Sequence, residues 1–293
     1  MSQRGQSRPV SVDHYENFPV ASVLCPPALR PTIGAIYGFA RTADDLADEG
    51  EVPAEQRLGD LAAYREDLQA VTEGHAPSPR WATVFEALRT ALQQHALPTV
   101  LLTDLLSAFE QDVVKHRYVD RPELLDYCRR SANPVGRLLL HLYGIDDAAS
   151  LRQSDSICTA LQLANFWQDL GIDAGRGRLY VPASDAARFG VGPKQLLDRV
   201  DAPTVHALIA DLVAWTTELM SSGAPLAMSV PGRAGWELRL VVQGGLRILE
   251  KIQGAGYATL LRRPRLRAYD VPLLLWRAVW MRANPSVVAR RSA

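Results

Sequence analysis

Two acidic segments that lie far apart in the sequence constrain the fold of this chain more than any other feature. Residues 37–48 read Tyr-Gly-Phe-Ala-Arg-Thr-Ala-Asp-Asp-Leu-Ala-Asp, and residues 162–173 read Gln-Leu-Ala-Asn-Phe-Trp-Gln-Asp-Leu-Gly-Ile-Asp. Each segment contains an Asp-x-x-x-Asp pair within a run that is otherwise typical of a buried helix. Because buried carboxylates are costly unless they have partners, we predict that the segments face each other across a helical cavity.

Helical geometry places the polar residues of each segment on one face. A helix turns by about 100° per residue, so Asp44 and Asp48 lie one turn apart and their side chains can converge. In the second segment, four polar residues fall within about 80° of one another. These residues are Gln162, Asn165, Asp169 and Asp173. Either segment alone is more typical of a solvent-exposed face, whereas the pair favours a shared site.

The chemistry of these side chains indicates a metal site. Oxygen-only ligands select a hard cation such as Mg²⁺, which bridges readily to phosphate and stabilises the charge of a departing diphosphate. The predicted metal ligands are Asp44, Asp48, Asn165, Asp169 and Asp173. Arg41 precedes Asp44 by three residues, so it can pair with that carboxylate or contact a bound anion. The apolar surroundings would suit a hydrocarbon chain.

The rest of the chain shows helical periodicity and little alternating apolar pattern. We therefore predict an all-α fold with about ten helices. The predicted domain covers residues 13–283, between a flexible lead-in at residues 1–12 and a basic tail at residues 284–293. The predicted helices are residues 31–48, 56–71, 81–95, 98–114, 121–133, 135–143, 154–170, 203–221, 236–254 and 271–283. Residues 171–192 are expected to form a glycine-rich connection.

The composition argues against several other classes of protein. With 32 basic and 32 acidic residues, the formal net charge is zero, so we expect no nucleic-acid partner. The cysteines Cys25, Cys128 and Cys158 are widely spaced and fit a reducing cytoplasm better than a disulfide framework. The polar N-terminus lacks the apolar core of a signal peptide, and no apolar run is long enough to span a bilayer. We therefore predict a cytoplasmic protein.

The two segments resemble the acidic motifs of the squalene/phytoene synthase family of head-to-head isoprenoid synthases. Residues 177–182, which read Gly-Arg-Leu-Tyr-Val-Pro, are similar to the stretch that follows the second motif in that family. The resemblance runs from about His14 to Arg263. It implies an isoprenoid synthase fold with a central helical cavity, a prenyl diphosphate substrate and a cluster of two or three Mg²⁺ ions.

Several departures from the family pattern resemble one branch, the hydroxysqualene synthases of bacterial hopanoid biosynthesis. Residues 14–18 keep the family's His and Phe but lack its serines, and Gln168 and Gly245 stand where Arg and Tyr are usual. Residues 16–21 (Glu-Asn-Phe-Pro-Val-Ala) and 131–140 (Ser-Ala-Asn-Pro-Val-Gly-Arg-Leu-Leu-Leu) are similar to that branch. The implied reaction converts presqualene diphosphate and water into hydroxysqualene and diphosphate.

Further residues are candidates for contacts with the substrate. The predicted diphosphate contacts are His14, Asn17, Arg41, Gln162, Arg178 and Arg262. The four motif aspartates are predicted to be catalytic as metal ligands, and Tyr127 as a residue that lines the cavity. For Tyr127 the competing interpretation is packing in the core. Isolated arginines are usually surface residues, and Arg178 is favoured because it follows the second motif.

Other functions are also compatible with this pattern. Condensation of two prenyl diphosphates head to head is one alternative. A non-catalytic assembly factor on the same fold is another, although such a factor should have lost its metal ligands. Residues 271–282 combine Trp, Leu and Arg, which is typical of a core-packing helix or of a peripheral contact with the inner membrane. The resemblance also implies that product is handed to other squalene-pathway enzymes.

Overall fold

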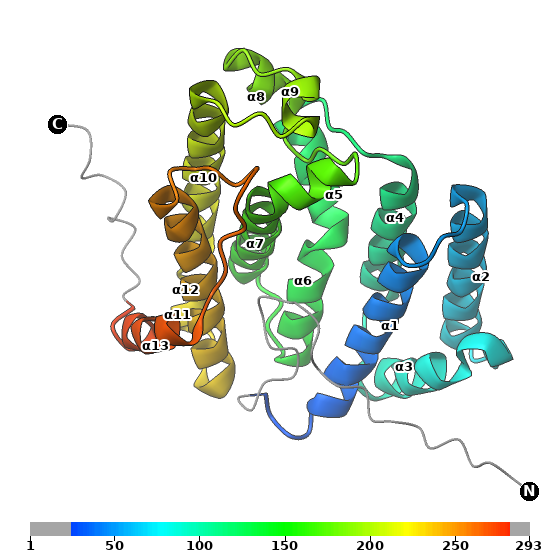
Figure 1. The fold of residues 1–293 in the computed structure, drawn as a ribbon. Helices are drawn as coiled ribbons and strands as arrows, with labels where there is room; N and C mark the ends of the chain where they lie inside the picture. The colour runs from blue at the N-terminus through cyan, green and yellow to red at the C-terminus, as the bar shows by residue number, and fades with distance from the viewer. Residues whose placement is uncertain (1–24, 282–293) are drawn as a thin grey trace, which may run out of the picture.

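The computed structural model describes residues 25–281, and all regular secondary structure within this range is helical (Figure 1). Extended pairing in this range is limited to an isolated bridge between Arg117 and Leu179. The predicted all-α fold is therefore confirmed. The features that lie outside the described residues are His14, Asn17, the predicted lead-in at 1–12 and the predicted tail at 284–293.

Thirteen α-helices and two 3₁₀ helices make up the described part of the chain. The α-helices are α1 (Arg30–Asp48), α2 (Ala54–Thr72), α3 (Ala82–His95), α4 (Thr99–Val114), α5 (Arg121–Ser131), α6 (Asn133–Leu142), α7 (Ala148–Gly175), α8 (Ala183–Arg188), α9 (Pro193–Leu197), α10 (Pro203–Gly223), α11 (Leu226–Ser229), α12 (Gly232–Gly254) and α13 (Val271–Val279). The 3₁₀ helices are η1 (Pro79–Trp81) and η2 (Ala268–Asp270). Sequence periodicity misses α8, α9 and α11, because four to six residues are too few to show a helical pattern.

The central helix α7 is longer at both ends than its periodicity predicts. The expected range is 154–170, whereas the helix spans Ala148–Gly175. At its start, the Asp147 carboxylate accepts hydrogen bonds from two backbone N–H groups of the first turn, at 3.1 and 2.9 Å, which is a typical N-cap. At its end, the additional residues include Asp173. Both aspartates of the second acidic segment therefore lie on one continuous helix.

A glycine inside α7 permits a close contact instead of ending the helix. A Cβ atom at Gly171 would lie 2.2 Å from the carbonyl oxygen of Leu260, which is far inside van der Waals contact. The expectation that Gly171 begins a connection is therefore wrong. The residue is small because the backbone of Leu260 packs directly against this face of the helix.

Three apolar clusters form the core of the described residues, and two of them each contain one acidic segment. One joins α1 to α2, α3 and α4, and includes Phe39, Tyr64 and Phe85, whose ring centroids lie 4.6–6.0 Å apart. The other surrounds α7, which runs through the middle of the molecule and packs against α5, α6, α10 and α12 (Figure 1). Within it, the buried Trp167 indole donates a hydrogen bond to Thr216 at 2.8 Å. Each acidic segment is thus held by a separate part of the core.

Candidate active site

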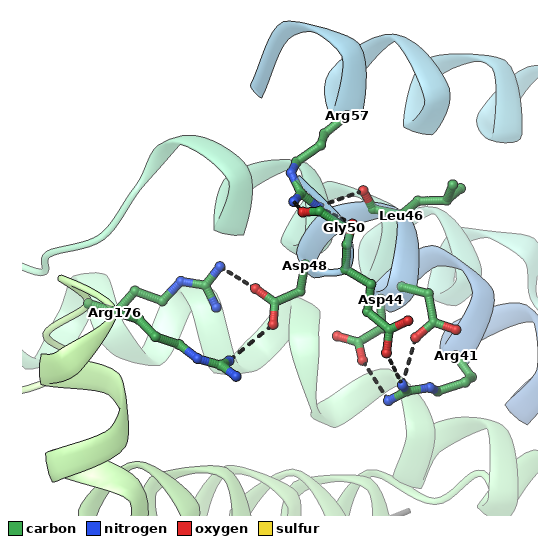
Figure 2. Close-up of polar contacts among 10 residues, drawn as sticks. Arg41, Asp44, Leu46, Asp48, Gly50, Arg57 and Arg176 are labelled. Carbon is green, nitrogen blue, oxygen red and sulfur yellow. Dashed lines mark hydrogen bonds and ion pairs between the residues drawn. The ribbon is translucent and has the colours of Figure 1, made fainter. Parts of the chain in front are cut away.

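Arg41 binds the carboxylates near the C-terminal end of α1 (Figure 2). Its guanidinium group lies 3.2 Å from Asp44, 2.7 Å from Asp45 and 2.9 Å from Glu49. Asp44 and Asp45 follow Arg41 by three and four residues, the spacing at which helical side chains meet. The predicted pairing of Arg41 with the first acidic segment is therefore present in the structure.

The turn that follows α7 brings the second acidic segment to the first. Arg178 Nη2 lies 2.5 Å from Asp48 Oδ1, and Arg176 Nη1 lies 3.2 Å from Asp48 Oδ2. Figure 2 shows Arg176 reaching across to Asp48 at the end of α1. Between the two arginines, Gly177 has a φ of +79°, in the left-handed region that favours glycine. This turn after α7 directs both guanidinium groups toward α1.

Asp44 and Asp173 resist ionisation because they are enclosed by protein and lie near other carboxylates. Partial burial raises the pKa of Asp44 to about 6, and the charge of Asp48 adds to the rise while Arg41 opposes it. Partial burial likewise raises the pKa of Asp173 to about 7, with a further rise from the charge of Asp169. Both carboxyl groups are therefore more readily protonated than a carboxyl group in water.

Asp112 on α4 is a further carboxylate of the site, and neither acidic motif contains it. Its Oδ2 accepts a hydrogen bond from the Tyr127 hydroxyl at 2.6 Å, whereas its Oδ1 is buried without a hydrogen-bond partner among residues 25–281. Burial raises the pKa of Asp112 to about 7, and the charges of Asp44 and Asp48 contribute to this rise. Asp112 is therefore electrostatically coupled to the first acidic segment.

Aromatic side chains form a wall beside Asp112. Phe166 on α7 stacks on Tyr180, with ring centroids 3.8 Å apart and an interplanar angle of 2°. Tyr127 lies 6.0 Å from Tyr180 and 6.1 Å from Phe166, and Tyr118 lies 5.5 Å from Tyr127. Tyr127 is only 3% exposed, so it packs in the core and also hydrogen-bonds to a site carboxylate. The wall thus consists of four buried rings next to a site carboxylate.

Asp169 pairs with Arg263, which directly follows the predicted diphosphate contact Arg262. Both of its oxygens pair with Arg263, whose Nη2 donates at 2.7 Å, a bidentate geometry. Arg262, the predicted diphosphate contact, is exposed and lines a neighbouring cavity of about 350 Å³ together with Gln168. Gln168 is 1% exposed and donates a hydrogen bond to the carbonyl oxygen of Pro264 at 2.6 Å. Its side chain therefore supports the chain around Pro264.

Gly245, where the family usually has tyrosine, lies in a tightly packed region of α12. A Cβ atom at this position would lie 2.7 Å from Met220 Cε and 2.8 Å from a methyl group of Leu161. A tyrosine at this position would have to displace both side chains. The core of this chain is therefore built around a small residue at position 245.

The predicted metal ligands have the chemistry that a hard divalent cation requires, since all of them offer oxygen atoms. Asp44 and Asp48 come from α1, and Asn165, Asp169 and Asp173 come from α7. Gln162 and Asn165 are half-buried on α7, before the two aspartates of that helix. The predicted oxygen donors of each segment thus lie on a single helix, α1 or α7.

Arginines bind several of these carboxylates in the structure. Within residues 25–281, no three Asp, Glu, His or Cys side chains are grouped closely enough to hold a metal ion. A bound cation would nevertheless give the unpartnered Oδ1 of Asp112 a partner and would favour the ionised forms of Asp44 and Asp173, whose pKa values burial raises. The donor set therefore fits Mg²⁺, provided that the arginines move aside as it binds.

Known proteins resemble this chain along most of its length. A family model for squalene/phytoene synthase matches residues 12–270. A hydroxysqualene synthase of Rhodopseudomonas palustris is 34% identical over 257 residues, which cover 86% of this chain and 85% of that protein. A presqualene diphosphate synthase of the same organism is 34% identical over 207 residues, which cover 68% and 72%. The crystal structure of squalene synthase HpnC from Alicyclobacillus acidocaldarius is 39% identical with a TM-score of 0.76, covering 83% of this chain and 90% of that one.

Proposed function

Because the chain belongs to the squalene/phytoene synthase family, we propose that it converts presqualene diphosphate and water into hydroxysqualene and diphosphate in a Mg²⁺-dependent reaction. The observation that carries this proposal is the pairing of Asp48 with Arg176 and Arg178, which joins α1 to the end of α7. This contact brings two arginines that directly follow the second acidic segment to the last carboxylate of the first segment. Departure of a diphosphate requires such a combination of metal ligands and cations.

The diphosphate would be bound by the metal ions and by the arginines of the site. When bound, Mg²⁺ would neutralise the charge that develops on the leaving diphosphate. The residues proposed to hold it are Asp44, Asp48, Asn165, Asp169 and Asp173. Arg41 and Arg178 can exchange a carboxylate for a diphosphate oxygen, since guanidinium binds either group in similar geometry. The further proposed diphosphate contacts are His14, Asn17, Gln162 and Arg262.

The aromatic wall and Asp112 fit the later steps of this reaction. Cleavage of the carbon–oxygen bond leaves both bonding electrons on diphosphate and creates a carbocation, which the rings of Phe166 and Tyr180 would stabilise. After rearrangement, a water oxygen bonds to the cation and releases one proton. Asp112 has an unpartnered Oδ1 and a pKa raised to about 7, which suits a proton acceptor. The hydrogen bond from Tyr127 would fix the orientation of that carboxylate.

Head-to-head condensation of two prenyl diphosphates is the second candidate. It is favoured by the presqualene diphosphate synthase relative, whose identity of 34% equals that of the hydroxysqualene synthase relative. The first candidate is preferred because Gln168 and Gly245 depart from the family pattern and are both built into the core. A non-catalytic assembly factor is disfavoured because the five oxygen ligands are retained.

Product identification distinguishes these candidates. The purified chain would be incubated with Mg²⁺ and either presqualene diphosphate or farnesyl diphosphate, and the products identified by mass spectrometry. Hydroxysqualene from the first substrate and no product from the second is the expected result. Efficient condensation of farnesyl diphosphate would favour the second candidate. Tight binding of both substrates without turnover would favour the assembly factor.

A further inference from the structure

The short helix α13 exposes its apolar side chains to solvent. Five apolar residues on it or directly after it are between 49% and 62% exposed. They are Val271, Leu275, Trp276, Val279 and Trp280. Tyr269, in the preceding 3₁₀ helix η2, is 66% exposed. We call these six residues the aromatic face.

The residues of this face that belong to α13 lie on one side of the helix. At about 100° per residue they cover roughly half of its circumference. On the other side, Ala278 is buried and Arg277 lies 2.6 Å from Glu250 of α12. At the start of the helix, Asp270 pairs with Arg247 at 2.9 Å. The helix therefore exposes apolar side chains on a face where a surface helix usually carries polar ones.

The size and composition of the aromatic face favour a bilayer surface over a protein partner. A stable protein interface takes roughly 20–30 residues on each side, whereas this face comprises six. Trp and Tyr are the residues enriched at the headgroup level of membranes, since their rings combine an apolar body with a polar edge. In the described part of the chain, no helix is long and apolar enough to cross a bilayer.

Exposed basic residues precede the aromatic face in the sequence. Arg265 and Arg267 are exposed shortly before it. Lys251 Nζ lies 4.7 Å from the centre of the Tyr269 ring, but its charge is paired with the buried Asp270 at 2.5 Å. The sequence that follows Met281 lies outside the described residues and contains three arginines and no acidic residue. Lys and Arg clusters beside an apolar helical face attract anionic lipid headgroups.

We propose that the aromatic face docks this protein onto anionic phospholipid bilayers. Trp276 and Trp280 enter the headgroup region, and the neighbouring basic residues contact lipid phosphates. The ion pairs of Arg277 and Arg247 hold the helix against α12 in the orientation that exposes this face. The proposal rests on these contacts and does not depend on which reaction the protein catalyses.

Vesicle co-sedimentation of the full chain tests this docking. We expect binding to vesicles that contain phosphatidylglycerol, weaker binding to phosphatidylcholine alone, and a decrease at high salt. The double variant Trp276→Ser/Trp280→Ser should lower the partition coefficient by roughly tenfold or more. Trp236→Ser is the matched control, because Trp236 is an exposed tryptophan of α12, 41% exposed, outside the aromatic face. Equal binding by the double variant and the control would overturn the proposal.

A pair of charge substitutions separates a lipid surface from a protein partner. Val279 is 56% exposed, so Val279→Lys and Val279→Glu should both fold, which circular dichroism would check. An anionic bilayer should tolerate the lysine and reject the glutamate, whereas an apolar protein interface should reject both. Dimerisation that requires Trp276 and Trp280, without vesicle binding, would also overturn the proposal. Quenching of tryptophan fluorescence by brominated lipids supplies a test on the unmodified chain, and absence of quenching would count against docking.

Discussion

Asp112 is the residue at which the cost of burying a charge should be measurable. Burial raises its pKa from 3.8 to about 7, so the folded state favours the protonated carboxyl group. The stability that this group contributes is therefore fully present below about pH 4 and is lost as the pH rises to about 7. We expect Asp112→Asn to raise the free energy of unfolding at pH 8 by at most about 4 kcal/mol, and to change it little at pH 4.5.

Urea unfolding of the metal-free protein at these two pH values would measure this effect. The control is Asp126→Asn, because Asp126 is half-exposed on α5 and pairs with Arg129 and Arg130. Its loss should give no gain in stability at pH 8. A difference between wild type and Asp112→Asn that is the same at both pH values would contradict the assigned pKa.

The proposed metal ligands lead to a second prediction for single residues. Asp48→Ala and Asp169→Ala should each lower kcat/KM for presqualene diphosphate by about a hundredfold or more, because each removes a carboxylate that would hold a metal ion at the leaving group. Steady-state kinetics over a range of Mg²⁺ concentrations would measure the loss. Asp126→Ala removes a surface aspartate and should leave the rate unchanged. Wild-type kinetics in either site variant would refute its assigned role.

Among single residues, the sequence predicts those that belong to a pattern and misses those that do not. Arg41 follows from its helical spacing to Asp44, and the structure shows the pair. Asp112 belongs to neither motif, yet it continues the buried stripe of α4 that runs through Leu101, Leu105 and Ala108. A carboxylate at the end of a buried apolar stripe indicates a candidate site residue, because burying it is costly without a partner. The ion pair between Arg263 and Asp169 depends on the path of the backbone after α12. No local sequence pattern predicts that path.

At the scale of the helices, α7 determines where the second acidic segment lies. Gly171 within this helix gives a third prediction. Gly171→Ala should destabilise the protein by about 1–3 kcal/mol, because the new methyl group would clash with the Leu260 carbonyl. Gly59→Ala in α2 is the matched control. A Cβ there meets nothing within 4 Å, so alanine should stabilise the helix by roughly 0.5–1 kcal/mol. Chemical unfolding of both variants would measure the difference, and equal stabilities would contradict the packing argument.

The helices themselves were predictable where they are long and amphipathic. The break between α5 and α6 falls close to Pro134, as the sequence predicts, because proline cannot continue a helix without losing a hydrogen bond. The end of α7 was predicted too early, because glycine usually marks a helix end. Here Gly171 instead serves a tertiary contact with Leu260, and tertiary packing is not visible in a local pattern.

At the scale of the whole molecule, the site lies where ion pairs connect the two core clusters that contain the acidic segments. The first cluster holds α1 and the second holds α7, and the ion pairs of Asp48 with Arg176 and Arg178 connect them. Partly exposed ion pairs contribute little to stability by themselves. The arrangement of the clusters at this point should therefore respond to any ligand that binds both of them.

This leads to a prediction for ligand binding by the intact protein. Mg²⁺ together with inorganic diphosphate should raise the melting temperature by roughly 5–10 °C at a hundredfold excess over the dissociation constant, because a ligand that binds only the folded state stabilises it. Arg178→Gln should reduce this rise, since it removes a proposed diphosphate contact. Arg137→Gln removes a comparable arginine, paired with Asp155 at 2.6 Å, and should preserve the rise. Thermal unfolding with Mg²⁺ alone, with diphosphate alone and with both together would measure these effects. An equal rise in melting temperature in the two variants would exclude Arg178 from diphosphate binding.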